Sequence, residues 1–210
     1  GDDGWVVIRT NPSAGAIAEA GTRIRPSQSA QLAKLIGRST ELSASAIRAA
    51  PGARGWYLAL IEVTTDSTRP SGPTALITLG GGEARGEEGQ PSALVLDRVY
   101  AHGWSQQTLR RCLALNSGAK AIVDSWLDDC HEKGADSQAI VGWGRTGPYL
   151  IENNTLAGAG ENVMFGGADP STPGLIPSDV ILRRNHIVTP IEWKGRWTKK
   201  NLIETKNVRR

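Results

Sequence analysis

Cysteine, histidine and phenylalanine are scarce in this chain of 210 residues, which contains two cysteines, three histidines and one phenylalanine. A zinc site needs about four ligands at close spacing, and the histidines show no His-Glu-x-x-His pattern, so we expect no zinc. Two cysteines are too few for a disulfide framework. We therefore expect Cys112 and Cys130 to be buried thiols or one isolated bridge.

Long apolar runs and a strong charge imbalance are also missing. No apolar run approaches the roughly 20 residues of a membrane-spanning helix, so we expect no membrane span. The net charge is only +3, and basic residues are dense only between Lys194 and Arg210. We interpret this run as a solvated face and expect no nucleic-acid partner.

What the sequence does contain is an internal repeat. One short aliphatic-polar segment recurs at intervals of 26 to 38 residues, with copies that begin at Leu58, Leu96, Ile122, Ile151 and Leu182. Each copy is followed by a second alternating run. These second runs begin at Ile77, Leu113, Ala139, Val163 and Ile203. Because one turn cannot bury its own apolar face, successive turns must stack on a shared core. The pattern predicts an all-β fold, a right-handed parallel β-helix (solenoid).

Stacking also predicts which residues meet at the corner of each turn. Parallel strands in register place equivalent residues about 4.8 Å apart in neighbouring turns. The corner position is then occupied by Val99, Ser125, Asn154 and Asn185. Asparagine suits a corner because it tolerates the left-handed conformation and can hydrogen-bond the asparagine of the next turn.

Two other folds have a similar content of strands. A β-sandwich or barrel would be built from hairpins, which favour two-residue Asn-Gly turns, and the chain has no Asn-Gly dipeptide. A doubly wound α/β fold would need a helix between successive strands. Helical windows occur only at Ser27–Ile36 and Ser43–Ala50. We therefore interpret residues 1–57 as an irregular N-terminal turn with a short helical insertion, and residues 58–210 as regular β-helix turns of one solenoid domain.

The chain starts and stops in strand-like sequence, without an evident capping element. A solenoid needs such elements to cover its core and its strand edges. We therefore expect a solenoid that is incomplete at both ends, as in a piece of a longer protein.

The stretch from Leu94 to Asn207 resembles bacterial right-handed parallel β-helix repeat proteins of the pectate-lyase (pectin-lyase-like) superfamily. The segments that carry the resemblance are Leu94–Arg98, His102–Gly103, Asp136–Ile140, Ile151–Asn154, Gly160–Asp169 and Arg183–His186. The resemblance implies a β-helix fold, a secreted or cell-envelope location, and a role with carbohydrates. It implies no particular catalytic residues.

Alternation along the second run of each turn predicts an outer face on which polar side chains gather. It places Gln138 and Asn162 in one outward column, and Ala114, Ile140, Met164 and Glu204 in another. Lys206 lies in a third column, and Asp136, Glu161 and Asp169 lie at the edges. Such a face could form the floor of a groove for a sugar chain.

A lyase acting on a uronate polysaccharide needs a base that removes the proton next to the carboxylate, and a cation that stabilises the enolate. We assign Lys206 as the candidate base, with Glu161 and Asp136 as further catalytic candidates. Glu204, Glu161 and Asp136 are candidate ligands for Ca²⁺, which prefers oxygen. No cofactor is otherwise required.

Candidate substrate-binding residues complete the prediction: Gln138, Asn162, Asp169, Trp143, Arg184 and His186. Exposed tryptophan faces suit sugar rings, because the apolar face of the ring stacks while its hydroxyls stay solvated. Tyr100, Trp126 and His186 share an outward ridge that is either a stacking surface or a packing ledge under a loop. The predicted partner is a polysaccharide or oligosaccharide.

Three functions stay open. The first is a polysaccharide lyase acting by β-elimination. The second is a non-catalytic β-helix that binds glycans or serves as a surface scaffold. The third is a glycoside hydrolase, in which Asp136 and Glu161 would be the two carboxylates.

Overall fold

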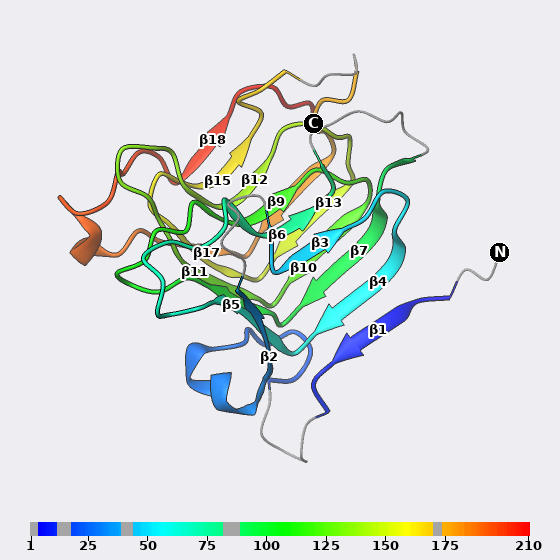
Figure 1. The fold of residues 1–210 in the computed structure, drawn as a ribbon. Coiled ribbons are helices and arrows are strands. Elements are labelled where there is room, and N and C mark those ends of the chain that lie inside the picture. Colours follow the sequence, from blue (N-terminus) through cyan, green and yellow to red (C-terminus); the bar gives the residue numbers. More distant parts are fainter. Residues whose placement is uncertain (1–3, 12–17, 39–43, 82–88, 170–173) are drawn as a thin grey trace.

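The chain folds into three parallel sheets of six strands, as described by a computed structural model of residues 4–11, 18–38, 44–81, 89–169 and 174–210. Each turn contributes one strand to each sheet, and the sheets enclose a common interior (Figure 1). The predicted all-β parallel β-helix is confirmed.

Sheet A contains β1 (Val6–Arg9), β4 (Arg54–Ala59), β7 (Ser92–Asp97), β10 (Lys120–Val123), β13 (Tyr149–Glu152) and β16 (Val180–Arg183). Sheet B contains β2 (Ala33–Gly37), β5 (Ile61–Thr65), β8 (Tyr100–His102), β11 (Trp126–Cys130), β14 (Thr155–Gly158) and β17 (His186–Ile187). Sheet C contains β3 (Ile47–Ala49), β6 (Ala75–Leu79), β9 (Arg111–Leu115), β12 (Gln138–Gly142), β15 (Glu161–Phe165) and β18 (Ile203–Thr205).

The register of sheet A follows the sequence repeat. The five positions that begin the first run are paired neighbours along the sheet. They are Leu58, Leu96, Ile122, Ile151 and Leu182. The first four are buried in one core cluster, and the fifth packs against that cluster. Burial of aliphatic side chains at about 25 cal/mol per Å² is the main force that holds the turns together.

The register of sheet C differs from the prediction at one strand. Leu113 pairs with Ile140, and Ile140 pairs with Val163, so the prediction that aligned Ala139 with Leu113 was wrong by one residue. Val141, and not Ile140, therefore lies outward beside Ala114. The error arises because two consecutive residues of β12, Ala139 and Ile140, are both buried in the core, which strict alternation does not allow.

The predicted corner ladder is present. Asn154 Nδ2 donates to Asn185 Oδ1 at 3.0 Å and to the Ile122 carbonyl at 2.9 Å. Asn154 Oδ1 accepts from the Ser125 backbone N–H at 2.8 Å, and Ser125 Oγ accepts from the Val99 N–H at 3.0 Å. These side chains therefore form hydrogen bonds with backbone N–H and carbonyl groups that the bend leaves unpaired.

The left-handed residue of this corner is the one before the ladder. Positive φ angles recur there at Leu60, Arg98, Asp124, Asn153 and Arg184. These angles lie between 49° and 56°. The ladder residues are thus selected for their side-chain hydrogen bonds, and the preceding position carries the strained backbone.

The first turn contains less helix than the two helical windows predicted. Pro26–Gln31 forms a 3-10 turn, and the next residues form β2. Within the second window, Ile47–Ala49 forms β3, while Ser43 lies outside the described residues. Pairing of β2 with β5 and of β3 with β6 outweighs local helical preference.

Cys112 and Cys130 form a disulfide with Cα atoms 5.6 Å apart, which makes them the isolated bridge of the two alternatives. It ties β9 to the end of β11 in the buried core. Closing a loop of this length stabilises a protein by roughly 3 kcal/mol.

Within the part of the chain that the structure describes, no helix is long and apolar enough to cross a bilayer.

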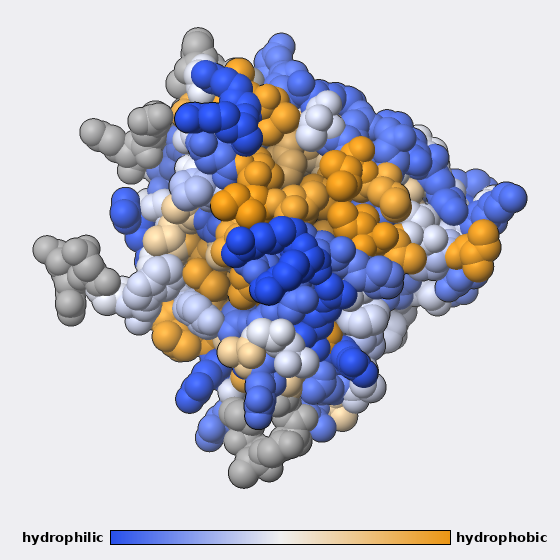
Figure 2. Space-filling view, turned by 180° about the vertical axis from the view of Figure 1, so that it is seen from behind, coloured by the Kyte–Doolittle hydropathy of each residue, from blue (hydrophilic) through white to orange (hydrophobic). Residues whose placement is uncertain are grey.

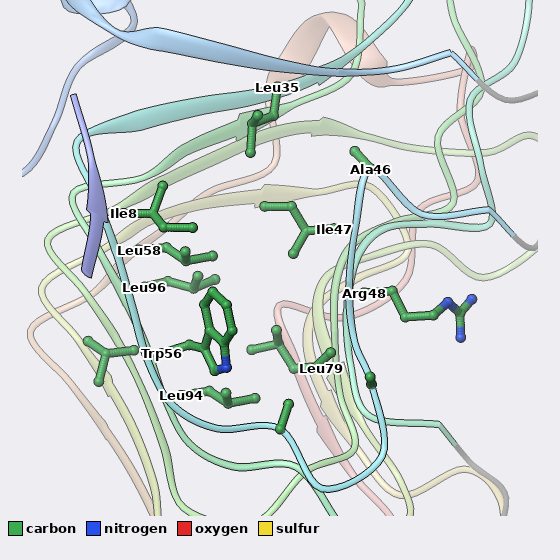
Figure 3. A pocket seen from close by; sticks show the side chains of 14 residues that line it. Ile8, Leu35, Ala46, Ile47, Arg48, Trp56, Leu58, Leu79, Leu94 and Leu96 are labelled. Atoms are coloured by element: carbon green, nitrogen blue, oxygen red, sulfur yellow. The ribbon is translucent and has the colours of Figure 1, made fainter. Parts of the chain in front are cut away.

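The core opens at its N-terminal end into a cavity of about 350 Å³. Ile8, Leu58 and Leu96 point into it from sheet A, and Ile47 and Leu79 from sheet C (Figure 3). Arg48 points away from this cavity, toward the outer side of β3 (Figure 3). On the opposite side of the molecule, apolar residues gather on the surface beside strongly hydrophilic ones (Figure 2).

Candidate functional site

The outer face of sheet C carries most of the residues that the sequence predicted for a site. One outward column contains paired neighbours from all six strands. They are Arg48, Thr78, Ala114, Val141, Met164 and Glu204. A second column contains Ala75, Arg111, Gln138 and Glu161. In the first column the small and apolar residues in the middle are buried, and the charged residues Arg48 and Glu204 lie at the two ends.

Three of the predicted carboxylates converge on a lysine that the sequence analysis did not select. Lys200 Nζ lies 2.7 Å from Glu161 Oε1, 3.3 Å from Asp136 Oδ2 and 3.8 Å from Glu204 Oε2. The Glu161 side chain is fully buried. Its hydrogen bond to Lys200 raises the lysine pKa, although burial acts in the opposite direction. Lys200 is therefore a fixed ammonium among the carboxylates.

The three carboxylates predicted as calcium ligands are paired with one lysine in this structure. Glu204, Glu161 and Asp136 do approach one another, but all three contact the Lys200 ammonium. Among the described residues, no group of three or more His, Cys, Asp or Glu side chains is arranged to hold a metal ion. The ion pairs supply the positive charge that a cation would otherwise bring.

Lys206, the candidate base, is ion-paired as well. Its Nζ lies 2.9 Å from Glu204 Oε1, and Asn201 donates to the other oxygen of the same carboxylate at 2.8 Å. The hydrogen bonds from Lys206 and Asn201 lower the Glu204 pKa. In this structure the Lys206 ammonium is therefore occupied by the Glu204 carboxylate, whereas a base must be free to accept a proton.

Gln138 connects the acidic end of the face to a basic one. Its Nε2 donates to Glu161 Oε2 at 2.7 Å, and its Oε1 accepts from Arg111 Nε at 3.1 Å. The Arg111 guanidinium lies over the Trp143 ring, 5.4 Å from the ring centroid. Burial, with a contribution from neighbouring Arg110, lowers the Arg111 pKa. Among the described residues, no carboxylate forms a salt bridge with Arg111.

A pocket of about 170 Å³ lies beside Arg111 and Trp143 on this face. Its described lining contains two arginines and no carboxylate. The lining residues are Ser45, Arg48, Thr74, Ala75, Thr78, Gly80, Gly81, Arg111, Ala114, Asn116 and Trp143. Asn116 Oδ1 accepts from the Trp143 and Gly144 N–H groups at 3.0 and 3.2 Å. Its buried Nδ2 donor has no partner among the described residues.

The remaining predicted residues lie elsewhere or have structural roles. Asn162 is fully buried, and its amide bonds the Gly158 N–H and the Val188 carbonyl, so it does not belong to the outer face. Asp169 accepts a hydrogen bond from Asn207 Nδ2 at 2.7 Å, beyond the end of β15.

Arg184 and His186 lie away from sheet C. Arg184 is the left-handed corner residue between sheets A and B, and it pairs with Glu152. His186 is exposed on β17 of sheet B. Two residues of the predicted ridge, Tyr100 and Trp126, pack against the cluster formed by Ile24, Leu32 and Leu60.

Comparison of the chain with protein-family models, with curated proteins and with solved structures gives no match. The description of the site therefore depends on its geometry alone.

Proposed function

We propose that this chain is a carbohydrate-binding β-helix that holds an acidic polysaccharide along the outer face of sheet C. The observation that carries the proposal is the pocket walled by Arg111 and Trp143. Its lining includes the Arg111 guanidinium, hydroxyls and an amide, and no described carboxylate. An arginine binds a carboxylate through two parallel hydrogen bonds, and an indole ring accepts the apolar face of a sugar.

The size of the pocket suits a polymer better than a free small molecule. At about 170 Å³ it is smaller than the roughly 300–1,000 Å³ typical of small-molecule pockets. One sugar unit of a longer chain would enter it.

The acidic half of the face supports binding better than elimination. Lys200 and Lys206 are both held by carboxylates, and such a network orients hydroxyl-binding groups without leaving a free base. We therefore propose no catalytic step for Lys206. Lyase activity and hydrolase activity are alternative results of the experiment described below.

Two further expectations belong to the same proposal. Membership of the pectate-lyase superfamily rests on the resemblance of Leu94–Asn207 and on the parallel β-helix itself. A secreted or cell-envelope location is supported by the disulfide between Cys112 and Cys130, because disulfides persist in oxidising compartments.

The test is calorimetric titration with oligouronates prepared from polygalacturonate and alginate. Trp143→Ala removes the stacking wall, and Arg111→Met removes the charge while keeping the apolar stem. We expect each change to weaken binding about tenfold, or about 1.4 kcal/mol. Trp104→Ala, a partly exposed tryptophan beside sheet B, is the matched control and should bind as the wild type does.

Absence of binding by the folded wild-type protein, or unchanged binding by both variants, would overturn the proposal. Each oligouronate is also incubated with the protein and followed by ultraviolet absorbance and by reducing-end assay. Unsaturated products would replace the binding function with a lyase, and saturated fragments would replace it with a hydrolase.

A further inference from the structure

A second pocket opens on a different sheet and has a different chemistry. It measures about 470 Å³ and lies on the outer side of sheet B, beside the 3-10 turn. Its lining residues are Pro26, Ser29, Lys34, Ile36, Arg38, Glu62, Thr64, Thr65, Asp66, Ser67, Tyr100, His102 and Trp104. This volume lies within the roughly 300–1,000 Å³ range of small-molecule sites.

The floor of this pocket is a fixed polar pair. Glu62 Oε1 lies 3.2 Å from His102 Nε2, and His102 Nδ1 lies 2.6 Å from the Gly103 carbonyl oxygen. Since a carbonyl oxygen only accepts, Nδ1 carries a proton and donates it. Glu62 Oε2 accepts from Ser29 and Lys34. Both Glu62 and His102 are almost fully buried.

Glu62 is held as a carboxylate. Burial raises its pKa, but the hydrogen bonds from Lys34 and Ser29 act in the opposite direction, and the pKa is lowered. An ionised carboxylate has about four acceptor sites; Ser29 and Lys34 donate to Oε2, while Oε1 faces His102 Nε2. A remaining acceptor can take a hydroxyl hydrogen from a ligand.

Aromatic rings form one wall above this floor. Tyr100 stacks on His102 with ring centroids 4.1 Å apart, and Trp104 stands nearly perpendicular to His102 at 5.2 Å. Trp104 Nε1 donates to the Thr65 carbonyl at 2.9 Å, which fixes the indole. The Trp104 residue is 38% exposed, so part of its surface is open to a ligand.

The charges of this lining balance, in contrast to the pocket on sheet C. Lys34 and Arg38 stand against Glu62 and Asp66. The Asp66 carboxylate already accepts two hydrogen bonds within its own turn. The Thr68 N–H donates to it at 3.0 Å, and the Thr68 hydroxyl donates at 2.7 Å. An acidic sugar would meet two carboxylates here, whereas a neutral sugar offers hydroxyls to them.

We propose that this pocket is a second saccharide site and that it selects neutral sugars. Trp104 provides the stacking surface, and Glu62, positioned by Lys34, Ser29 and His102, accepts hydrogen bonds from the sugar hydroxyls. Geometry and charge balance carry this assignment, and it does not depend on the site on sheet C.

The test is calorimetric titration of the full chain with three neutral probes, namely cello-, manno- and galacto-oligosaccharides. We expect at least one to bind, Trp104→Ala to weaken that binding at least tenfold, and Trp104→Phe to restore part of it. Trp143→Ala is the matched control and should leave the neutral affinity unchanged. Far-UV circular dichroism and the thermal midpoint establish that each variant is folded.

Three results would overturn the proposal: no neutral probe saturates the folded wild type, Trp104→Ala binds as tightly as the wild type, or an oligouronate displaces the neutral probe competitively. Loss of oligouronate binding alone bears only on the site of sheet C. The two proposals therefore fail separately.

Discussion

Lys120 occupies an inward position of sheet A, where its register neighbours are Leu94 and Tyr149. Its ammonium lies 3.5 Å from the centroid of the Tyr149 ring and donates to the Ser117 carbonyl. Burial, followed by repulsion from Arg145, lowers the Lys120 pKa well below its ordinary value. No carboxylate among the described residues compensates this charge. Lys120 therefore lowers the stability of the folded state at every pH at which the unfolded chain carries this lysine in its protonated form.

Lys120→Met should raise the free energy of unfolding at neutral pH by roughly 1–4 kcal/mol, the range in which apolar replacement of buried charge is stabilising. The unfolded lysine titrates near 10.4, so between the lowered native pKa and that value the unfolded state binds more protons. Wild-type stability should rise with pH through this window and then level off. Urea titrations at several pH values measure both effects. An identical pH slope in the variant would contradict the argument.

At the scale of single residues, the sequence predicted which side chains lie on the outer face of sheet C better than it predicted how those side chains interact. Asp136, Glu161 and Glu204 do meet, because the repeat fixed their strands and turns. Lys200 could not be assigned, since it lies in a turn whose path no periodicity describes. Arg111 was missed because Cys112 and Leu113 both point inward, and strict alternation from Leu113 would have buried it.

At the scale of strands, the Asn ladder makes a prediction about the contribution of its buried hydrogen bonds to stability. Asn154→Ala removes the acceptor of the Ser125 N–H and the donor to the Ile122 carbonyl in a fully buried corner. We expect a loss of about 2–4 kcal/mol, since each buried unsatisfied group costs roughly 1–3 kcal/mol. Asn185→Ala is the control, at a half-buried corner where water can replace the amide. Urea titrations measure the free energy of unfolding of both variants. Equal losses would show that burial of the ladder does not change its contribution to stability.

Strands that repeat were predictable, and β2 and β3 of the first turn were not. From β4 onward, aliphatic positions recur in phase, and their register in sheet A agrees with the alignment of the sequence. The side chains of β2 are mostly exposed, so no apolar alternation marks this strand. Its extended conformation comes from pairing with β5, a long-range contact. Proline at the start of the preceding turn gave a local helical signal that extended only to Gln31.

At the scale of the whole molecule, the two proposed pockets belong to different sheets. One opens beside Trp143 on sheet C, and the other beside Trp104 on sheet B. The disulfide and the shared core hold these sheets in one rigid unit. A single molecule could then hold an acidic and a neutral glycan at once, which would make it a bridge between two polysaccharides.

This prediction rests on both proposed sites and has a test of its own. Beads carrying polygalacturonate should retain a fluorescent form of the neutral glycan that binds best, but only when the protein is added. Trp143→Ala should reduce retention of both protein and neutral glycan, whereas Trp104→Ala should leave the protein on the beads and reduce retention of the neutral glycan alone. Because a bridge needs both sites of one molecule, a large excess of free protein should reduce retention by occupying the two glycans separately. Retention of the neutral glycan by Trp104→Ala, or retention that rises without limit with added protein, would exclude bridging.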